Sequence, residues 1–324
     1  MADDSVASTG RTIIVVGAGI SGLLLAASLK ARGESVVVLE KSRGLGGRLA
    51  TKRVGGAVFD QGAQYFTARQ AAFRALVAAW RTRGAVTKWP AADTDRLIGT
   101  PSMNAIGTLL AEGLDVRRES QVVGVRREGG HWVLEIDKQA AMRAGRLVLT
   151  APVPQSLALL RSGGVVLPDR LWLDLQALTY HPCLALLVTL GGPSAVPVEG
   201  LAPHAGPVRW LADNIKKGIS ADAASAITVH LEAAFSAAHY AGTEAELARL
   251  VLPVIEPWLG APVLNVGLHR WKFSEPTTTH AEPYVWRAEI GLGLAGDGFG
   301  GPRVENAALS ALALADRMAE TAEV

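Results

Sequence analysis

The hydrophobic positions near the start of the chain form two short strands separated by an apolar helix. Residues 12–16 are all β-branched, and such a run without polar interruption predicts a parallel strand buried on both faces. Residues 23–31 are rich in leucine and alanine, which predicts a helix that ends before Gly33. Residues 36–39 predict a second buried strand. This order of strand, helix and strand is typical of the βαβ unit of an α/β fold.

The middle of the chain shows both helical and strand periodicity. Residues 121–126 and 131–137 alternate between apolar and polar positions around a Gly-Gly pair, so they predict an antiparallel hairpin. Residues 146–151 predict a buried strand that returns the chain to the parallel sheet. Residues 71–83 predict an amphipathic helix, and we expect its apolar stripe to pack in the core. That stripe consists of Phe73, Leu76, Val77 and Trp80.

The pattern changes between residues 154 and 268. Apolar strands at 184–190 and 226–231 are separated by Pro/Gly turns and followed by a helical segment at 243–252. We expect an antiparallel sheet with helices, inserted as a substrate domain into a Rossmann-type α/β nucleotide-binding domain. The expected nucleotide-binding domain comprises residues 1–70, 97–153 and 269–324, and the expected substrate domain comprises residues 71–96 and 154–268.

The C-terminal region repeats a glycine spacing found in nucleotide-binding proteins. Residues 291–296 have the spacing GxGxxG. We exclude a second nucleotide site there, because no second strand follows the helix expected at 304–318 to complete a βαβ unit. Instead we expect a strand at 289–295 that ends in a Gly-Asp pair, followed by a loop at 298–302.

Composition and charge narrow the classes of partner. The 324 residues include 32 Lys and Arg against 30 Asp and Glu, a net charge of +2 that argues against nucleic acid or an anionic membrane as the main partner. The single cysteine, Cys183, can form neither an internal disulfide nor a Cys-based zinc site. The longest apolar stretches, 22–29 and 184–190, are far shorter than a membrane span of about 18–20 residues. With a polar, acidic N-terminus that lacks an export signal, the sequence predicts a soluble cytoplasmic protein.

A glycine-rich turn directly follows the first predicted strand. In its GxGxxG spacing, Gly17 allows the tight turn, Gly19 lets backbone amides approach a pyrophosphate, and Gly22 allows close helix–strand packing. Glu40 ends the second strand at 40 − 22 = 18 residues past the last glycine, where a carboxylate accepts both hydroxyls of an adenosine ribose. Because Glu40 would repel a 2′-phosphate, the motif predicts FAD or NAD rather than NADP.

The residues after Glu40 distinguish these two cofactors. Gly46, Gly47 and Arg48 form a second element of close backbone approach, where an NAD dehydrogenase would have an ordinary loop. This favours FAD, and the alternative is a flexible basic loop. The sequence contains no HExxH, paired-histidine or GxSxG motif, so no metal site is predicted.

These cofactor motifs carry a resemblance to a known family. Residues 39–48, followed by residues 60–69, resemble the renalase-like members of the flavin-dependent amine oxidase superfamily. That superfamily includes monoamine and polyamine oxidases, protoporphyrinogen oxidase and phytoene desaturases. Weaker matches extend the resemblance from Thr12 over nearly the whole chain, at residues 99–103, 210–214, 269–271, 296–297 and 303–305.

The resemblance implies a noncovalently bound FAD. The backbone at Val122 or Val123 is then expected to bind the adenine, and Asp297 to accept a hydrogen bond from the ribityl chain. The helix from Arg303 would direct its N-terminal dipole at the flavin pyrimidine. No cysteine lies near Asp297, which excludes a cysteinyl flavin. The expected cofactor-binding residues are Gly17, Gly19, Ile20, Ser21, Gly22, Glu40, Lys41, Gly46, Gly47, Arg48, Gly62, Ala63, Gln64, Val122, Val123, Ala151, Gly296, Asp297, Arg303 and Val304.

The resemblance also implies an activity. Renalase-like enzymes oxidise isomeric dihydronicotinamide dinucleotides that carry the hydride at ring position 2 or 6. The hydride passes to flavin N5, NAD(P)⁺ leaves, and O₂ reoxidises the flavin and becomes H₂O₂. The alternatives are an amine oxidase or desaturase with another small amine or apolar substrate and, in a different class, a flavin-binding protein without turnover. The expected partners are a small-molecule substrate and O₂, with neither nucleic acid nor membrane, and the oligomeric state stays open.

We expect the substrate to lie over the flavin ring, between the two domains. By resemblance and chemical type, the residues expected to act on it are Gln64, Tyr65, Trp210, Asn214, His230 and Trp271. Each has a structural alternative: the tryptophans as core aromatics, the histidine as a buried hydrogen-bonded residue, and the tyrosine as the anchor of its loop. Lys216, Lys217 and Arg209 are candidates to attract a substrate phosphate, and the alternative for the two adjacent lysines is that they are simply solvated. The sequence departs from the family pattern after Asp297, where no bulky residue follows, and at Lys217-Gly218, which lacks an intervening proline.

Overall fold

The structure is a computed structural model that describes residues 12–90, 95–203, 206–220 and 225–321. Its internal contacts divide the chain into two compact units. Unit 1 consists of residues 1–47, 107–179 and 276–324, and unit 2 consists of residues 48–106 and 180–275.

These units differ from the expected domains at four segments. Two of them are short, residues 97–106 and 269–275, which were expected in the nucleotide-binding domain and fall in unit 2. Residues 48–70 fall in unit 2 rather than with the nucleotide-binding residues, because Ala57 and Phe59 pack against the sheet of unit 2 at Leu187 and Ala226. Residues 154–179 fall in unit 1. There the end of a helix approaches a strand so closely that a Cβ at Gly163 would lie 1.6 Å from the carbonyl oxygen of Val125. As a division of function, the expected domains stay a prediction.

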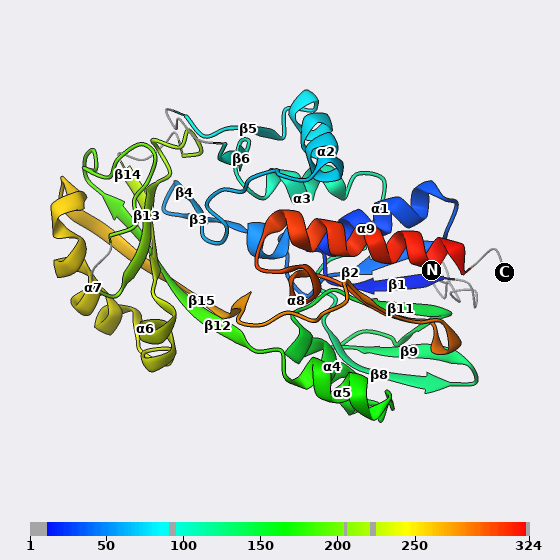
Figure 1. The fold of residues 1–324 in the computed structure, drawn as a ribbon. Coiled ribbons are helices and arrows are strands. Elements are labelled where there is room, and N and C mark those ends of the chain that lie inside the picture. The colour runs from blue at the N-terminus through cyan, green and yellow to red at the C-terminus, as the bar shows by residue number, and fades with distance from the viewer. Residues whose placement is uncertain (1–11, 91–94, 204–205, 221–224, 322–324) are drawn as a thin grey trace, which may run out of the picture. The chain divides into compact units, whose positions relative to one another are not determined.

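Unit 1 is built on a six-stranded sheet in the order β16-β17-β11-β1-β2-β7 (Figure 1). All neighbouring pairs are parallel except β16 with β17, which is an antiparallel pair at one edge. The βαβ unit and the returning strand expected from the sequence are therefore confirmed. The strands are β1 (Ile13–Val16), β2 (Val36–Leu39), β7 (Asp115–Arg117), β11 (Arg146–Leu149), β16 (Val285–Arg287) and β17 (Leu292–Leu294).

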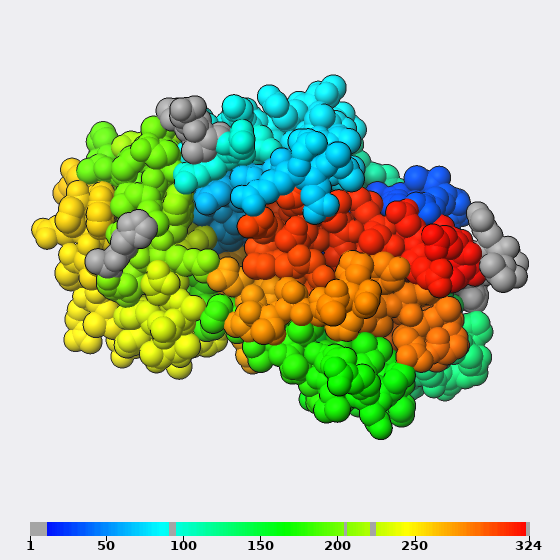
Figure 2. Space-filling view, viewed as in Figure 1, coloured from blue at the N-terminus to red at the C-terminus, as the bar shows by residue number. Residues whose placement is uncertain are grey.

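The core of unit 1 lies between this sheet and two helices. Helix α1 (Ile20–Ala31) buries Leu23, Leu25 and Leu29, and α9 (Val304–Glu320) buries Leu314 and Met318 in the same apolar cluster. Figure 2 shows the outer side of α9 on the surface of this unit, next to the segment that precedes it. The remaining helices of the region are α3 (Ala105–Leu110), which begins at the boundary with unit 2, α4 (Val153–Ser162), α5 (Asp169–Gln176) and α8 (Asp297–Gly300).

The predicted hairpin belongs to a separate three-stranded sheet of unit 1. Strand β8 (Val122–Glu128) pairs antiparallel with β9 (His131–Ile136), and β10 (Met142–Ala144) adds to the other side of β9. A β-bulge interrupts the register between Val122 and Gly124. The hairpin expected at 121–137 is confirmed.

Unit 2 contains a four-stranded sheet in the order β13-β14-β12-β15. Its inner face packs against the helix α7 (Glu244–Leu259), which buries Leu247, Val251 and Ile255. The strands are β12 (Tyr180–Leu190), β13 (Val208–Asp213), β14 (Ser225–Leu231) and β15 (Val263–Pro276). The unit is completed by the hairpins β3–β4 (Thr51–Val54 and Ala57–Asp60) and β5–β6 (Val86–Lys88 and Leu97–Gly99), by α2 (Ala71–Thr82) and α6 (Ala233–Ala238), and by the 3₁₀ turn η1 (Gly47–Leu49) at its start.

Helix α7 is longer than the sequence predicts. The expected helix ends at Leu252, before Pro253, whereas α7 continues through Pro253 and Pro257 to Leu259. Each proline removes one backbone hydrogen bond, yet both prolines are exposed, so water can satisfy the freed carbonyls. Burial of the apolar face on the sheet outweighs this loss.

The C-terminal segment also differs locally from the prediction. The strand expected at 289–295 is reduced to β17, because a 3₁₀ turn, η2 (Ala288–Ile290), precedes it and Gly291 takes the left-handed conformation at φ +61°. The loop expected at 298–302 begins instead as the last residues of α8. The helix expected at 304–318 is confirmed as α9 and extends to Glu320.

Candidate dinucleotide and substrate sites

The glycine-rich turn joins β1 to α1 as the sequence predicts. Gly17 has φ +108° and donates its N–H to the carbonyl of Leu39 at 2.8 Å. A Cβ at Gly22 would lie 1.9 Å from the Gly17 carbonyl oxygen, so only glycine fits at both ends of the turn. At Gly19, in contrast, a Cβ would meet no protein atom within 4 Å. Packing within the chain therefore does not require glycine at position 19. A phosphate that approaches the backbone closely would require it, because a side chain would occupy the same space.

The carboxylate of Glu40 lies beside this turn. One oxygen accepts the N–H of Ala18 and the other accepts the N–H of Ser42, both at 2.8 Å. Only 7% of Glu40 is exposed, and its carbonyl accepts the N–H of Ser120 at 2.9 Å. These bonds hold Glu40 at the carboxyl end of β2, where the ribose of a dinucleotide is bound in Rossmann-type folds.

The second glycine pair lies against the first. Gly46 donates its N–H to the carbonyl of Ala18 at 2.8 Å, and a Cβ at Gly47 would lie 3.2 Å from the Cα of Gly19. Gly107, which the sequence analysis missed, packs on the other side, since a Cβ there would lie 2.7 Å from the nitrogen of Gly46. The two motifs therefore form one backbone surface, as expected for a loop that approaches a pyrophosphate.

The C-terminal motif reaches the same edge of the sheet. Gly296 follows β17 at φ +136°, and a Cβ on it would lie 3.7 Å from the carbonyl of Thr150 and 3.8 Å from the hydroxyl of Ser21. The hydroxyl of Thr150 also donates to the carbonyls of Val16 at 3.0 Å and Gly17 at 3.2 Å. Thr150 was not among the predicted site residues, although its position at the end of a buried strand of the parallel sheet could have indicated it.

The remaining cofactor candidates of unit 1 lie near the ends of its strands and helices. Asp297 is 7% exposed at the start of α8, and Arg303 is the exposed N-cap residue of α9. At the start of β8, Val122 is buried, while Val123 is 47% exposed. Ile20 and Ser21 open α1, Lys41 is exposed after β2, Ala151 follows β11, and Val304 begins α9. The tertiary structure thus brings the carboxyl ends of β1, β2, β11 and β17 together within unit 1.

In unit 2, a loop after β4 holds the other cofactor candidates. Ala63 donates its N–H to the carbonyl of Arg48 at 2.9 Å, and a Cβ at Gly62 would lie 2.0 Å from that oxygen. The guanidinium of Arg48 donates to the carbonyls of Phe273 at 3.4 Å and Ser274 at 3.1 Å. Gly62 is therefore required by packing, and the cofactor contacts of Arg48, Gly62, Ala63 and Gln64 stay predictions.

A buried ion pair supports this loop. Lys217 donates to a carboxylate oxygen of Asp60 at 2.9 Å, and neither side chain has any exposed surface. The other oxygen of Asp60 accepts from the Thr51 hydroxyl at 2.7 Å and the Met103 N–H at 3.0 Å. Burial lowers the pKa of Lys217, while the Asp60 charge opposes this shift.

The cations considered for a substrate phosphate are therefore engaged elsewhere. Lys217 is not solvated, because its amine also lies 3.4 Å from the side-chain carbonyl of Gln64. Lys216 donates to the carbonyls of Ser194 at 3.0 Å and Val196 at 2.7 Å. Arg209 forms a two-point pair with Glu275 at 2.7 and 3.1 Å. Lys217 is therefore not solvated as the alternative expected, and phosphate binding by these residues stays a prediction.

Two of the expected substrate residues converge on one carbonyl. The ring nitrogen Nε2 of His230 lies 3.1 Å from the carbonyl oxygen of Gln61, and the indole N–H of Trp271 donates to the same oxygen at 2.9 Å. Burial lowers the pKa of His230 to about 4, so its imidazole is neutral at pH 7. Burial likewise lowers the pKa of His269, which packs edge-on against Trp271, to about 4.

The side chain of Asn214 is hydrogen-bonded within the chain and supports the loop after β4. Its side-chain carbonyl accepts the N–H of Asp60 at 3.2 Å, and its amide donates to the carbonyl of Ala226 at 2.8 Å and the hydroxyl of Thr228 at 3.0 Å. Asn214 is fully buried. In this structure it orients the loop and presents no surface to a substrate.

Tyr65 and Trp210 lie in a cluster of aromatic rings. Their ring centroids are 5.6 Å apart, and Trp89 lies 5.9 Å from Tyr65 and 6.3 Å from Trp210. The guanidinium of Arg96 lies over the Tyr65 ring at 4.6 Å and the Trp210 ring at 5.1 Å. Trp89 and Arg96 were not predicted, since only the hairpin β5–β6 brings them together.

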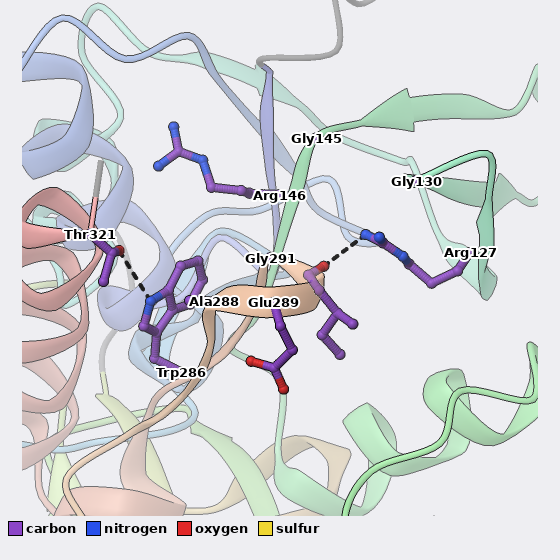
Figure 3. Close-up of a pocket in the computed structure, with 10 residues that line it drawn as sticks. Arg127, Gly130, Gly145, Arg146, Trp286, Ala288, Glu289, Gly291 and Thr321 are labelled. Atoms are coloured by element: carbon purple, nitrogen blue, oxygen red, sulfur yellow. Dashed lines mark hydrogen bonds between the residues drawn. The ribbon is translucent and has the colours of Figure 1, made fainter. Parts of the chain in front are cut away.

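A pocket elsewhere in unit 1 contains none of the predicted residues (Figure 3). Its lining includes Arg127, which donates to the carbonyl of Ile290 at 2.8 Å, and Trp286, which donates to the hydroxyl of Thr321 at 3.2 Å. Arg146 lines it as well and pairs with Glu34 at 2.6 Å. Both arginines already have protein partners, so the pocket assigns no ligand.

Among the residues with described positions, no group of three His, Cys, Asp or Glu side chains is arranged to hold a metal ion. Within that part of the chain, no helix is both long and apolar enough to cross a membrane.

Comparison with known proteins supports the nucleotide-binding segment. Residues 15–80 match the NAD(P)-binding Rossmann-like domain family. Protoporphyrinogen oxidase 2 of Arabidopsis thaliana is 43% identical over 61 residues, which are 19% of this chain and 12% of that protein. Putrescine oxidase of Kocuria rosea is 43% identical over 67 residues, 21% of this chain and 14% of that protein. The matched segments thus span only a small part of these relatives' length.

Solved structures share the fold over nearly the whole chain. A putative protoporphyrinogen oxidase from Exiguobacterium has a TM-score of 0.75 at 15% identity and covers 96% of this chain and 99% of its own. Cyclohexylamine oxidase from Brevibacterium oxydans has a TM-score of 0.74 at 13% identity, covering 98% and 100%. The predicted fold class, a Rossmann-type α/β domain together with a separate antiparallel sheet, is confirmed. The superfamily resemblance is supported, and the predicted noncovalent FAD is consistent with these relatives.

Proposed function

We propose that this chain is an FAD-dependent oxidase of the renalase type, which oxidises 2- or 6-dihydro isomers of NAD(P)H. The observation that carries the flavin assignment is the meeting of three motifs at one sheet edge. The GxGxxG turn, Gly46-Gly47 and Gly296-Asp297 are far apart in the sequence, yet Gly296 lies beside Thr150 and Ser21. A nicotinamide dinucleotide site needs the first of these, whereas a flavin site uses all three.

The residues of unit 1 are suited to bind a dinucleotide and to orient a flavin. The amides at the start of α1 attract the pyrophosphate, and Glu40 accepts the ribose hydroxyls. Asp297 accepts a hydrogen bond from the ribityl chain. The N-terminus of α9 lowers the energy of negative charge on the pyrimidine.

FAD, when bound, accepts the hydride at N5 and returns the two electrons to O₂, which takes up two protons and leaves as H₂O₂. The chain itself supplies orientation and exclusion of water. In unit 2, Gln64, Tyr65, Trp210, His230 and Trp271 are the residues proposed to position the dihydropyridine ring. Because the imidazole of His230 is neutral at pH 7, it adds no positive charge that would oppose the nicotinamide cation formed as product.

The proposal is tested by anaerobic titration of the FAD-bound protein. Aged NADH rich in the isomers should bleach the flavin band, while fresh NADH and phenylethylamine should not. Admission of air should restore the band and produce one H₂O₂ per NAD⁺. If the isomers do not bleach the flavin of a protein that retains FAD, the renalase-type assignment is wrong.

The second candidate is an oxidase or desaturase of another small amine or apolar substrate. The names of the similar proteins favour it, since they include putrescine oxidase and cyclohexylamine oxidase. Putrescine and cyclohexylamine therefore belong in the same titration, and bleaching by an amine alone would select this candidate. A flavin-binding protein without turnover would retain FAD and respond to none of the compounds.

A further inference from the structure

The aromatic cluster of unit 2 already holds a cation that belongs to the chain. We define the Arg96 box as Tyr65, Trp89, Trp210 and the guanidinium of Arg96, which lies 4.6 Å, 5.9 Å and 5.1 Å from the three ring centroids in that order. Aromatic rings gathered at such distances are the usual receptor for an alkylammonium group. Here that position is filled by a side chain of fixed positive charge.

The box is rigidly framed. Trp89 donates its N–H to the carbonyl of Arg96 at 3.0 Å, and Phe66 and Leu97 exchange two backbone hydrogen bonds at 2.9 and 2.8 Å. The indole of Trp89 donates to the carbonyl of Val198 at 2.7 Å. These bonds fix the loop that carries Tyr65 against the end of the hairpin where β5 leads into β6. The guanidinium is therefore presented in one place rather than on a free side chain.

The box has more N–H donors than acceptors. Over the described ranges, the guanidinium makes one hydrogen bond, to the carbonyl of Glu199 at 2.8 Å, and no carboxylate there lies within ion-pair distance of it. By contrast, Arg209 on β13 is held by both oxygens of Glu275. The indole N–H of Trp210 is buried and, in the same described residues, has no hydrogen-bond partner. A buried donor without an acceptor is unfavourable, so the box as a whole is short of negative oxygen atoms.

We propose that the Arg96 box is a specificity site that binds an oxyanionic group of the substrate, a phosphate or a carboxylate, and excludes ammonium groups. The flat guanidinium lies over the rings, and its N–H groups other than the one bound to Glu199 are suited to two parallel bonds to an oxyanion. An ammonium ion would have to displace Arg96 from the rings and remain beside its charge. The inference rests on the proposed function only in treating the loop of Gln64 and Tyr65 as facing the substrate, and it assigns that substrate a negative group.

Direct binding to the FAD-saturated full chain tests the proposal without turnover. Isothermal titration calorimetry compares inorganic pyrophosphate, benzoate and phenylethylammonium on the wild type and on Arg96→Gln. The substitution should lower the affinity for the better-bound anion about tenfold or more, as expected for loss of a charge-assisted hydrogen bond. It should also strengthen phenylethylammonium binding. Pyrophosphate bound more tightly than benzoate indicates a phosphate group, and the reverse order indicates a carboxylate.

Two further variants keep the test decisive if Arg96→Gln folds poorly. Arg96→Lys retains the charge but not the planar edge, so it should lose anion affinity and still exclude the ammonium. Trp210→Phe keeps an aromatic ring and removes the unpartnered N–H. It should lower the affinity for the anion a few-fold, as expected for the loss of one hydrogen bond. Arg249→Gln, an exposed arginine of α7, is the control for net charge and should bind all three probes as the wild type does.

The proposal is overturned if the ratio of anion to ammonium affinity changes by less than about threefold between wild type and Arg96→Gln, since a tenfold change is the minimum expected. This result is separable from failure of the proposed function. A chain whose flavin is not bleached by the dihydronicotinamide isomers, but whose affinity ratio shifts as described, retains the oxyanion site and needs a different anionic substrate.

Discussion

At the scale of single residues, the candidate sites combine glycines that packing requires with polar side chains that are hydrogen-bonded within the chain. Gly17, Gly22 and Gly62 are glycines because any Cβ would collide with a backbone oxygen or hydroxyl group less than 3 Å away. Gly19 has no such neighbour. The distinction separates glycines that serve the fold from a glycine whose open side is suited to a ligand.

Asp297 provides a direct test of the flavin assignment. Asp297→Ala should weaken retention of FAD by about tenfold, because one hydrogen bond from the carboxylate to the ribityl chain is lost. The ratio of FAD to protein after gel filtration measures this. Asp316→Ala, which removes an exposed partner of Arg32 on α9, should retain FAD as the wild type does. Equal FAD content in both variants would contradict the ribityl role.

The buried histidine predicts a pH dependence of stability. Burial lowers the pKa of His230 from 6.5 to about 4, so the unfolded chain takes up this proton at a higher pH than the folded chain. The free energy of unfolding is therefore highest above pH 6.5, and this contribution falls by roughly 3 kcal/mol as the pH decreases towards 4. His269 has the same direction of shift and adds to the loss.

Urea unfolding at pH 7 and pH 5 measures this effect. His230→Gln keeps a donor for the carbonyl of Gln61 but does not titrate, so its free energy of unfolding should fall less between these two pH values than that of the wild type. His181→Gln changes an exposed histidine of β12 and serves as the control. An unchanged pH dependence in His230→Gln would show that this histidine is protonated without difficulty in the folded chain.

At the scale of elements, α7 shows tertiary packing overriding a local signal. Its two prolines predict a helix end at Leu252, but the face formed by Leu247, Val251 and Ile255 continues past the first of them. A capping box at Thr243 and Glu246 fixes the start of the helix, and Gly260 at φ +73° ends it.

Ile255→Ala should therefore destabilise the chain although it lies beyond Pro253. The side chain is fully buried against the four-stranded sheet, and its removal should lower the free energy of unfolding by about 2–5 kcal/mol. Glu256→Ala, at the exposed neighbouring position, should change it by less than about 0.5 kcal/mol. Urea unfolding followed by tryptophan fluorescence compares the two. If both substitutions changed the free energy of unfolding by similarly small amounts, packing of the apolar face beyond Pro253 would not stabilise the helix.

At the scale of the whole molecule, the chain consists of two units with separate cores. Shared fold with oxidases whose sequences are 13–15% identical does not carry their substrates over to this chain. In our proposal, the side chains of the Arg96 box distinguish one substrate from another. The expected contacts to the cofactor, by contrast, are largely made by backbone, which a fold preserves while sequences diverge.

Binding of FAD should protect unit 1 at one edge. Hydrogen exchange on addition of FAD to the cofactor-free protein should slow at the amides of residues 17–22, 46–47 and 296–304. The amides in the middle of α7 should exchange as before, because no cofactor contact is expected there. FAD at a hundred times its dissociation constant should add about 2.7 kcal/mol to the free energy of unfolding. Equal protection of α7 would indicate a global effect instead of binding at the predicted edge.

The sequence alone determined the parts of this protein that depend on local order. The strand, glycine turn, helix and acidic residue over residues 12–40 are contiguous, and each step follows from periodicity and backbone freedom. Tertiary structure alone decided the burial of Lys217 against Asp60, the meeting of Gly296 with Thr150, and the stacking of Arg96 between rings from three segments. Those contacts join residues that are far apart along the chain, and no local pattern records which charge will find which partner.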